Sequence, residues 1–170
     1  AGFYDISVSR FKKPGVFKNI PGMEDEMRRL VMVVSYKGRS AFLRTFPDTQ
    51  FWPDQSNIAA VFTQLTANEQ SKVYYTTGSL ERSIYKIGER EFHNHTISKI
   101  NREALINIGF AVDSVSLETN DIPADASMLV LADPKVMLSG AVKDKIRKYV
   151  DAGGNMMVFA EPGKQQVLNP

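Results

Sequence analysis

Residues 128–160 read MLVLADPKVMLSGAVKDKIRKYVDAGGNMMVFA and contain two short apolar runs with a helix pattern between them. Met128–Ala132 is continuously apolar, as expected of a strand that is covered on both faces. Ser139 can cap the helix, and Gly153-Gly154 ends it before the second run at 155–160. The apolar stripe of this helix consists of Val142, Ile146, Tyr149 and Val150. A strand, a helix and a strand in this order predict two parallel strands joined by a right-handed crossover.

The same pattern precedes this stretch. Lys72–Thr76 is predicted as a strand and Phe110–Leu117 as the next one, with a helix between them that is capped by Thr96 and stopped by Gly109. The apolar face of that helix consists of Ile97, Ile100, Ala104, Leu105 and Ile108. The connection 118–127 contains Pro123 and is predicted to cross as a loop. Together these elements predict an α/β fold with a flavodoxin-like, doubly wound parallel sheet in the strand order 2-1-3-4.

The N-terminal part has a different pattern. Residues 1–26 predict an irregular arm, and Leu30–Tyr36 and Ser40–Phe46 predict a β-hairpin that turns at residues 37–39. Asp54 can cap a following helix. The apolar face of this helix consists of Ile58, Val61, Phe62 and Leu65. The sequence therefore predicts a lobe at 1–68 and an α/β domain at 69–170. Because such a domain normally continues beyond its fourth strand, we expect it to be truncated at its C-terminal end.

Composition excludes several classes of function. The chain has 43% hydrophobic and 24% charged residues, which is typical of a folded protein. A net charge of +2 is too small to indicate a nucleic-acid partner. The absence of cysteine excludes disulfides, thiolate metal sites and cysteine nucleophiles. No apolar run approaches about 18 residues, so no membrane span is expected within these residues. The first residues lack the features of a secretion signal, which predicts either a cytoplasmic protein or a piece of a longer chain.

Several short motifs, in order and spacing, resemble one family. They are residues 73–78 (VYYTTG), 122–123 (IP), 126–130 (ASMLV), 133–135 (DPK), 149–155 (YVDAGGN) and 161–162 (EP). The chain resembles the gliding-motility G-like auxiliary component of ABC-type transport systems, which is related to class I glutamine amidotransferase-like and intraflagellar-transport domains. Residues 28–65 also resemble the region that precedes this domain, so the likeness covers roughly residues 28–163.

The resemblance implies a place and partners for the chain. It implies the extracytoplasmic (periplasmic) part of an inner-membrane protein, anchored through segments outside this sequence, with an ABC transporter permease or another envelope protein as partner. A cytoplasmic location is the alternative. The family often carries Gly-His-Gly-Glu after the first strand, where this chain has Gly78-Ser79-Leu80-Glu81. Only Gly78 and Glu81 match, so a role that needs the histidine does not carry over.

Two polar loops form the candidate ligand site. In an open parallel sheet, ligands bind beyond the carboxyl ends of the strands, where the strand order reverses. Residues 77–82 and 133–135 are predicted to meet there, and Gly78 permits a tight turn. The side chains that can contact a small ligand, such as a sugar or an anion, are Ser79, Glu81, Arg82, Asp133 and Lys135. The plainer alternative is that Gly78 only turns the chain and Glu81 pairs with Arg82 or a neighbour.

The sequence predicts neither catalysis nor a cofactor. Relatives of the amidotransferase type use a cysteine nucleophile paired with histidine, and this chain has no cysteine. Ser79 would need a base, and the chain's two histidines, His93 and His95, lie at the end of the following loop, which would have to fold back to reach it. These two imidazoles are also a weak metal site, even with Glu89 and Glu91 nearby, so no metal is expected. A degenerate hydrolase is the remaining alternative to a binding module.

Overall fold

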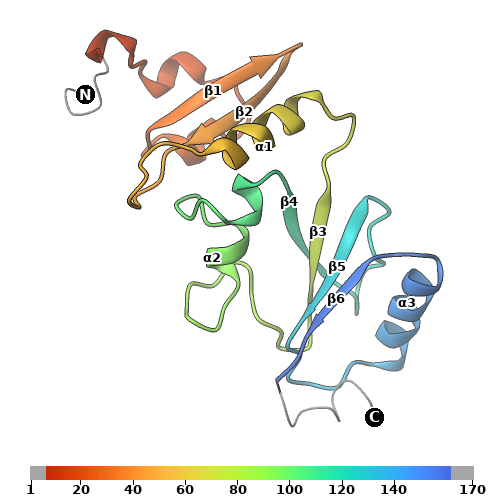
Figure 1. Ribbon diagram of the computed structural model, residues 1–170. Helices are drawn as coiled ribbons and strands as arrows, with labels where there is room; N and C mark the ends of the chain where they lie inside the picture. The colour runs from red at the N-terminus through yellow and green to blue at the C-terminus, as the bar shows by residue number, and fades with distance from the viewer. Residues whose placement is uncertain (1–6, 162–170) are drawn as a thin grey trace.

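A computed structural model of the chain describes residues 7–161 and contains a β-hairpin and a separate four-stranded parallel sheet (Figure 1). From residue 7 onward, the N-terminal arm contains three 3₁₀ turns, η2 (Val8–Arg10), η3 (Pro14–Phe17) and η4 (Met23–Glu26). It leads into the antiparallel strands β1 (Val31–Tyr36) and β2 (Arg39–Arg44). The arm lies beside β1 at the top of Figure 1.

The hairpin turns in two residues. Lys37 and Gly38 have φ angles of 47° and 79°, the left-handed conformation that tight hairpin turns require. The predicted hairpin is confirmed, with Arg39 belonging to the second strand rather than to the turn.

Helix α1 (Gln55–Thr66) covers the hairpin and begins as predicted. The Asp54 carboxylate accepts from the Asn57 N–H at 3.0 Å, and the Asn57 side chain accepts from the Asp54 N–H at 3.2 Å. This reciprocal pair satisfies two N–H groups at the helix start that have no partner within the helix. Val61 and Leu65 then pack on Ala41 of β2 to form the small core of this lobe.

The parallel sheet has the predicted strand order. Its strands are β3 (Lys72–Thr77), β4 (Ala111–Ser116), β5 (Ala126–Ala132) and β6 (Met156–Phe159), arranged β4-β3-β5-β6. All three pairings are parallel. Taken in chain order this is 2-1-3-4, compatible with a flavodoxin-like fold, so the predicted fold class is confirmed. The division after residue 68 stays a prediction.

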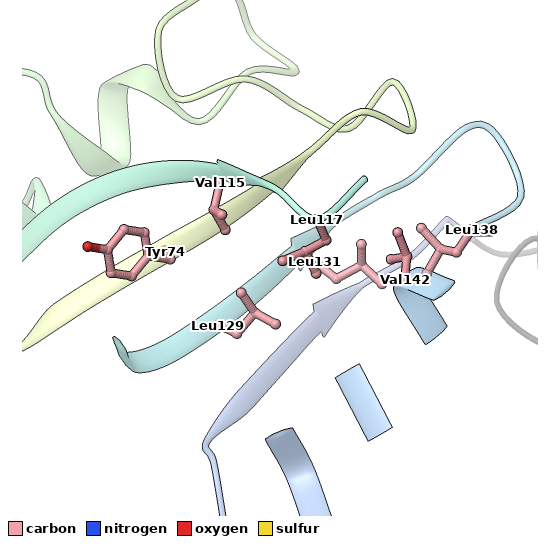
Figure 2. Packing of buried hydrophobic residues seen from close by; sticks show 7 residues of the cluster. All are labelled: Tyr74, Val115, Leu117, Leu129, Leu131, Leu138 and Val142. Carbon is pink, nitrogen blue, oxygen red and sulfur yellow. The ribbon is translucent and has the colours of Figure 1, made fainter. Parts of the chain in front are cut away.

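The two central strands are covered on both faces, so residues 73–76 of β3 and 129–132 of β5 are buried. Helix α3 (Gly140–Asp151) begins at the predicted cap, Ser139, and packs on one face. Figure 2 shows Leu138 and Val142 directed at strand side chains of that face. The chain between β3 and β4 covers the other face, where Ile84 is fully buried. No helix in residues 7–161 combines the length and the apolar character that crossing a bilayer requires.

The helix predicted at 97–108 is wrong. The structure has only a four-residue helix, α2 (His93–Thr96), and a 3₁₀ turn, η5 (Leu105–Asn107), with Thr96 at the end of α2 rather than at a cap. The Asn107 amide donates to the carbonyls of Ser98 and Asn101 at 2.9 and 2.7 Å. Because this side chain satisfies carbonyls that helical N–H groups would otherwise bind, it stabilises an irregular path. Gly109 does end the segment, with a φ of 107°.

A buried carboxylate fixes the arm and the hairpin to the α/β part. Glu26 is only 1% exposed; its carboxylate lies 2.8 Å from Arg44 of β2 and 2.9 Å from Lys99. Burial would raise the pKa of Glu26, but hydrogen bonds from Arg44 and Lys99 outweigh burial and hold the pKa below its ordinary value. Arg44 also donates to Asn107 at 2.9 Å. One charge network therefore joins the arm, β2 and the 97–108 segment.

Candidate functional site

The two predicted loops do meet at the carboxyl end of the sheet. The Ser79 carbonyl accepts from the backbone N–H groups of Lys135 and Val136 at 2.9 and 3.2 Å. The Arg82 N–H donates to the Ala132 carbonyl at 2.9 Å. These bonds fix the loop after β3 to the loop after β5, at the place where the strand order reverses.

Three residues at this edge also have a positive φ angle. Gly78 has a φ of 118°, which suits glycine, but Leu80 and Asp133 both have a φ of 55°. Left-handed backbone costs a residue with a side chain about 1–2 kcal/mol. Among the described residues, the remaining non-glycine with positive φ is Lys37 of the hairpin turn. Strained backbone of this kind persists where the surrounding contacts hold it and is common at binding sites.

Asp133 is the centre of a charge cluster. Its side chain is 3% exposed and accepts from Arg82 Nε at 3.0 Å and Nη2 at 2.9 Å, and from Lys135 Nζ. Burial would raise the pKa of Asp133, but the hydrogen bonds from Lys135 and Arg82 outweigh burial and hold its pKa below the ordinary value. The hydrogen bond to Asp133 raises the pKa of Lys135. Asp133 therefore stays ionised, and Lys135 stays cationic, at neutral pH.

Two further residues complete the cluster. Glu161, just after β6, lies 3.2 Å from Arg82, 3.1 Å from Lys135 and 2.9 Å from Arg90. Arg82 also donates to the Arg90 carbonyl at 3.1 Å, and its guanidinium lies 6.0 Å from the centre of the Phe92 ring. Among the described residues, three cations and two carboxylates thus face one another, which leaves one positive charge in excess within this part of the chain.

The candidate residues fall into two groups. Arg82, Asp133 and Lys135 share the charge cluster, whereas Ser79 and Glu81 lie beside it. Glu81 accepts from the Ser79 N–H at 2.6 Å, so it bonds a neighbour in the chain, which is one of the two partners that the plainer alternative named. Whether any of them contacts a ligand stays a prediction.

Sequence reasoning missed Arg90 and Glu161 as members of this site. Glu161 had a usable signal, because it follows a predicted strand of the same parallel sheet and so belongs to the same edge. Arg90 lies in a polar stretch that carries no comparable signal.

No histidine pairs with the Ser79 hydroxyl among the described residues. The described residues show no hydrogen bond or ion pair from the imidazoles of His93 or His95, both of which belong to α2. Within residues 7–161, no three His, Asp or Glu side chains gather closely enough to hold a metal ion. What the edge does present is exposed apolar side chains on the two joined loops: Leu80 (71% exposed), Val136 (48%) and Met137 (55%).

The parallel sheet lies in a region of the chain that matches a known protein family. Residues 70–170 match the family described as "ABC-type uncharacterized transport system". The chain belongs to this family. The match begins just before β3 and includes all four strands of the parallel sheet, both loops of the site and Glu161. The family indicates an auxiliary component of an ABC-type transport system, as the resemblance in the sequence implied. Neither the curated proteins nor the solved structures gave a match.

Proposed function

We propose that this chain is a non-catalytic, extracytoplasmic domain of a membrane protein that works with an ABC transporter permease. It binds its protein partner through the carboxyl edge of the parallel sheet. The observation that carries the proposal is the family match over residues 70–170, which includes the whole of that edge. The short motifs quoted from the sequence support the finer assignment to the gliding-motility G-like group, with a glutamine amidotransferase-like domain.

The chemistry of the edge supports binding rather than catalysis. The charged groups of the cluster contact one another, and Ser79 has no imidazole partner among the described residues. A serine nucleophile needs a base within hydrogen-bonding distance and a group that orients this base. The cluster instead fixes the shape of the two loops.

The exposed apolar side chains support a protein partner. Leu80, Val136 and Met137 lie on loops that Ser79 joins through its backbone, and Leu80 keeps its exposed position although its backbone is strained. Exposed apolar side chains on rigid loops are typical of protein-binding surfaces.

Co-purification of the full-length protein with its permease tests the binding surface. The Leu80→Lys/Met137→Lys variant should lose the permease, whereas Val150→Lys should retain it. Val150 is a suitable control because it is also apolar and 45% exposed, yet it lies near the end of α3, away from these loops. Equal recovery of the permease with both variants would contradict the proposed surface.

Location needs a separate measurement. A reporter enzyme that is active only outside the cytoplasm, fused after Pro170 of the full-length protein, should be active in cells. A reporter that is active only inside the cytoplasm should be inactive at the same position. The opposite pair of results would place the domain in the cytoplasm.

A small anionic ligand is the second candidate, because the described residues of the cluster carry one positive charge in excess. An anion bound by Arg82 and Lys135 would stabilise the folded state by mass action. A panel of sugars and anionic metabolites should then raise the melting temperature of the parent chain but not of Arg82→Gln. No shift with any member of the panel would count against this candidate.

A further inference from the structure

A cavity lies between the N-terminal arm and strand β1, far along the chain from the site described above. Its volume is about 410 Å³, within the range of small-molecule sites. Most of the side chains that line it are apolar: Phe11, Phe17, Met23, Leu30, Val31, Met32, Val33 and Trp52. The cavity therefore offers an apolar surface for the body of a ligand.

The arm that forms one wall is fixed by its last turn. Met23 is 5% exposed and Glu26 is 1% exposed, so η4 is anchored on the hairpin while η2 and η3 lie further out. Gly22, with a φ of 80°, turns the chain into η4 and lies against the Phe42 ring. The wall is thus held at one end by buried contacts.

Three cationic side chains are part of the lining of the cavity. Arg10, Lys12 and Arg29 line it and are exposed, and within the described residues their side chains form no ion pair or hydrogen bond. The fourth charged residue of the lining, Glu26, is already neutralised by Arg44 and by Lys99. The cavity therefore combines an apolar interior with three cations that have no anionic partner in residues 7–161.

We propose that this cavity binds a single-chain amphiphilic anion, a long-chain carboxylate. The acyl chain lies among the apolar side chains, and the carboxylate pairs with Arg10, Lys12 and Arg29. Charge complementarity carries this choice, because an uncharged apolar ligand leaves the three cations unpaired and a cationic one is repelled. The site is independent of the proposed permease surface.

The chain supplies its own probe. Trp52 is its single tryptophan and lines the cavity, so its fluorescence reports on occupancy. Titration of the whole chain with monomeric brominated dodecanoate should quench Trp52 to saturation. Dodecyltrimethylammonium, which has the same chain length and the opposite charge, should not change the signal, and neither should acetate, which has no chain.

Two triple variants with the same loss of charge separate the cavity from general attraction. Removing the lining cations in Arg10→Gln/Lys12→Gln/Arg29→Gln should weaken binding at least about tenfold, because hydrogen bonds between charged partners are lost. The control removes three cations that do not line this cavity and should bind like the parent: Lys13→Gln, Lys18→Gln and Arg28→Gln.

Three results would overturn the proposal. One is equal weakening in both triple variants, which would indicate attraction by net charge alone. Another is binding to anionic vesicles with no quenching by monomeric brominated dodecanoate, which would indicate adsorption to a membrane surface. The third is binding of an extended acidic peptide along β1 with no response to dodecanoate, which would make the cavity a peptide site.

Discussion

Replacing Asp133 with asparagine tests whether the charge cluster holds the two loops together. The Asp133 carboxylate is almost fully buried and accepts from Arg82 at 2.9 and 3.0 Å and from Lys135. Asparagine keeps the shape of the side chain and tolerates the left-handed backbone of this position, so Asp133→Asn removes the charge and little else.

The expected loss is about 2 kcal/mol in the free energy of unfolding. Removing one partner of a fully buried ion pair costs about 3–5 kcal/mol. Here Arg82 and Lys135 are 26% and 31% exposed, and both remain within ion-pair distance of Glu161, so the cost is lower. For a chain of this size, about 2 kcal/mol corresponds to a fall of about 4–8 °C in Tm.

Thermal unfolding followed by circular dichroism, together with urea unfolding, measures this loss. Asp144→Asn is the matched control, because Asp144 pairs with Arg147 at 3.0 Å but both side chains are more than 60% exposed. Such exposed pairs are worth about 0–1 kcal/mol. If Asp133→Asn and Asp144→Asn unfold at the same temperature, the cluster does not stabilise the loops and this reasoning fails.

Other perturbations test the core, the end of α3 and the buried carboxylates. Leu129→Ala removes a side chain with no exposed surface and should cost about 2–5 kcal/mol, measured by urea unfolding. Gly154→Ala would place a Cβ 2.4 Å from the Tyr149 ring, so the ring must move; we expect a loss of about 1–3 kcal/mol in the same measurement. The pKa values of Asp133 and Glu26 are lowered in the folded state, so their stabilisation is present above the ordinary values of 3.8 and 4.5 and is lost as pH falls below them. Unfolding at a series of pH values from 6 downward should show this loss mainly below about 4.5, and Asp133→Asn should show less of it.

The parallel sheet could be predicted because its signals are local and agree. Met128–Ala132 is apolar without interruption, and Ser139 and Gly153 mark the start and end of α3 by their own backbone preferences. The same reasoning wrongly predicted a helix at 97–108, because the spacing of apolar residues in this segment fits a helix. Its path is instead set by the bonds of Asn107 to Ser98, Asn101 and Arg44, and no periodicity reveals contacts of that kind.

The candidate site could be predicted in place but not in detail. The rule for open parallel sheets identified the two loops, and the structure joins them through Ser79. The direction in which each side chain points depends on the local backbone conformation, which sequence patterns do not reveal. Arg82 bonds Asp133 rather than its sequence neighbour Glu81, because Asp133 adopts a left-handed backbone and lies opposite Arg82.

The strand order β4-β3-β5-β6 also has a consequence for how the chain folds during synthesis. β3 is made before the strands on either side of it, and its second partner is complete only at Ala132. Val73 and Tyr75, which end up buried, therefore lack their second partner strand while more than fifty further residues are added to the chain. The hairpin β1–β2, which precedes β3 in the chain, closes through a two-residue turn, so its two strands can pair soon after they are made. A nascent chain of this protein thus exposes one unpaired edge of β3, which can pair with another chain, until β5 is complete.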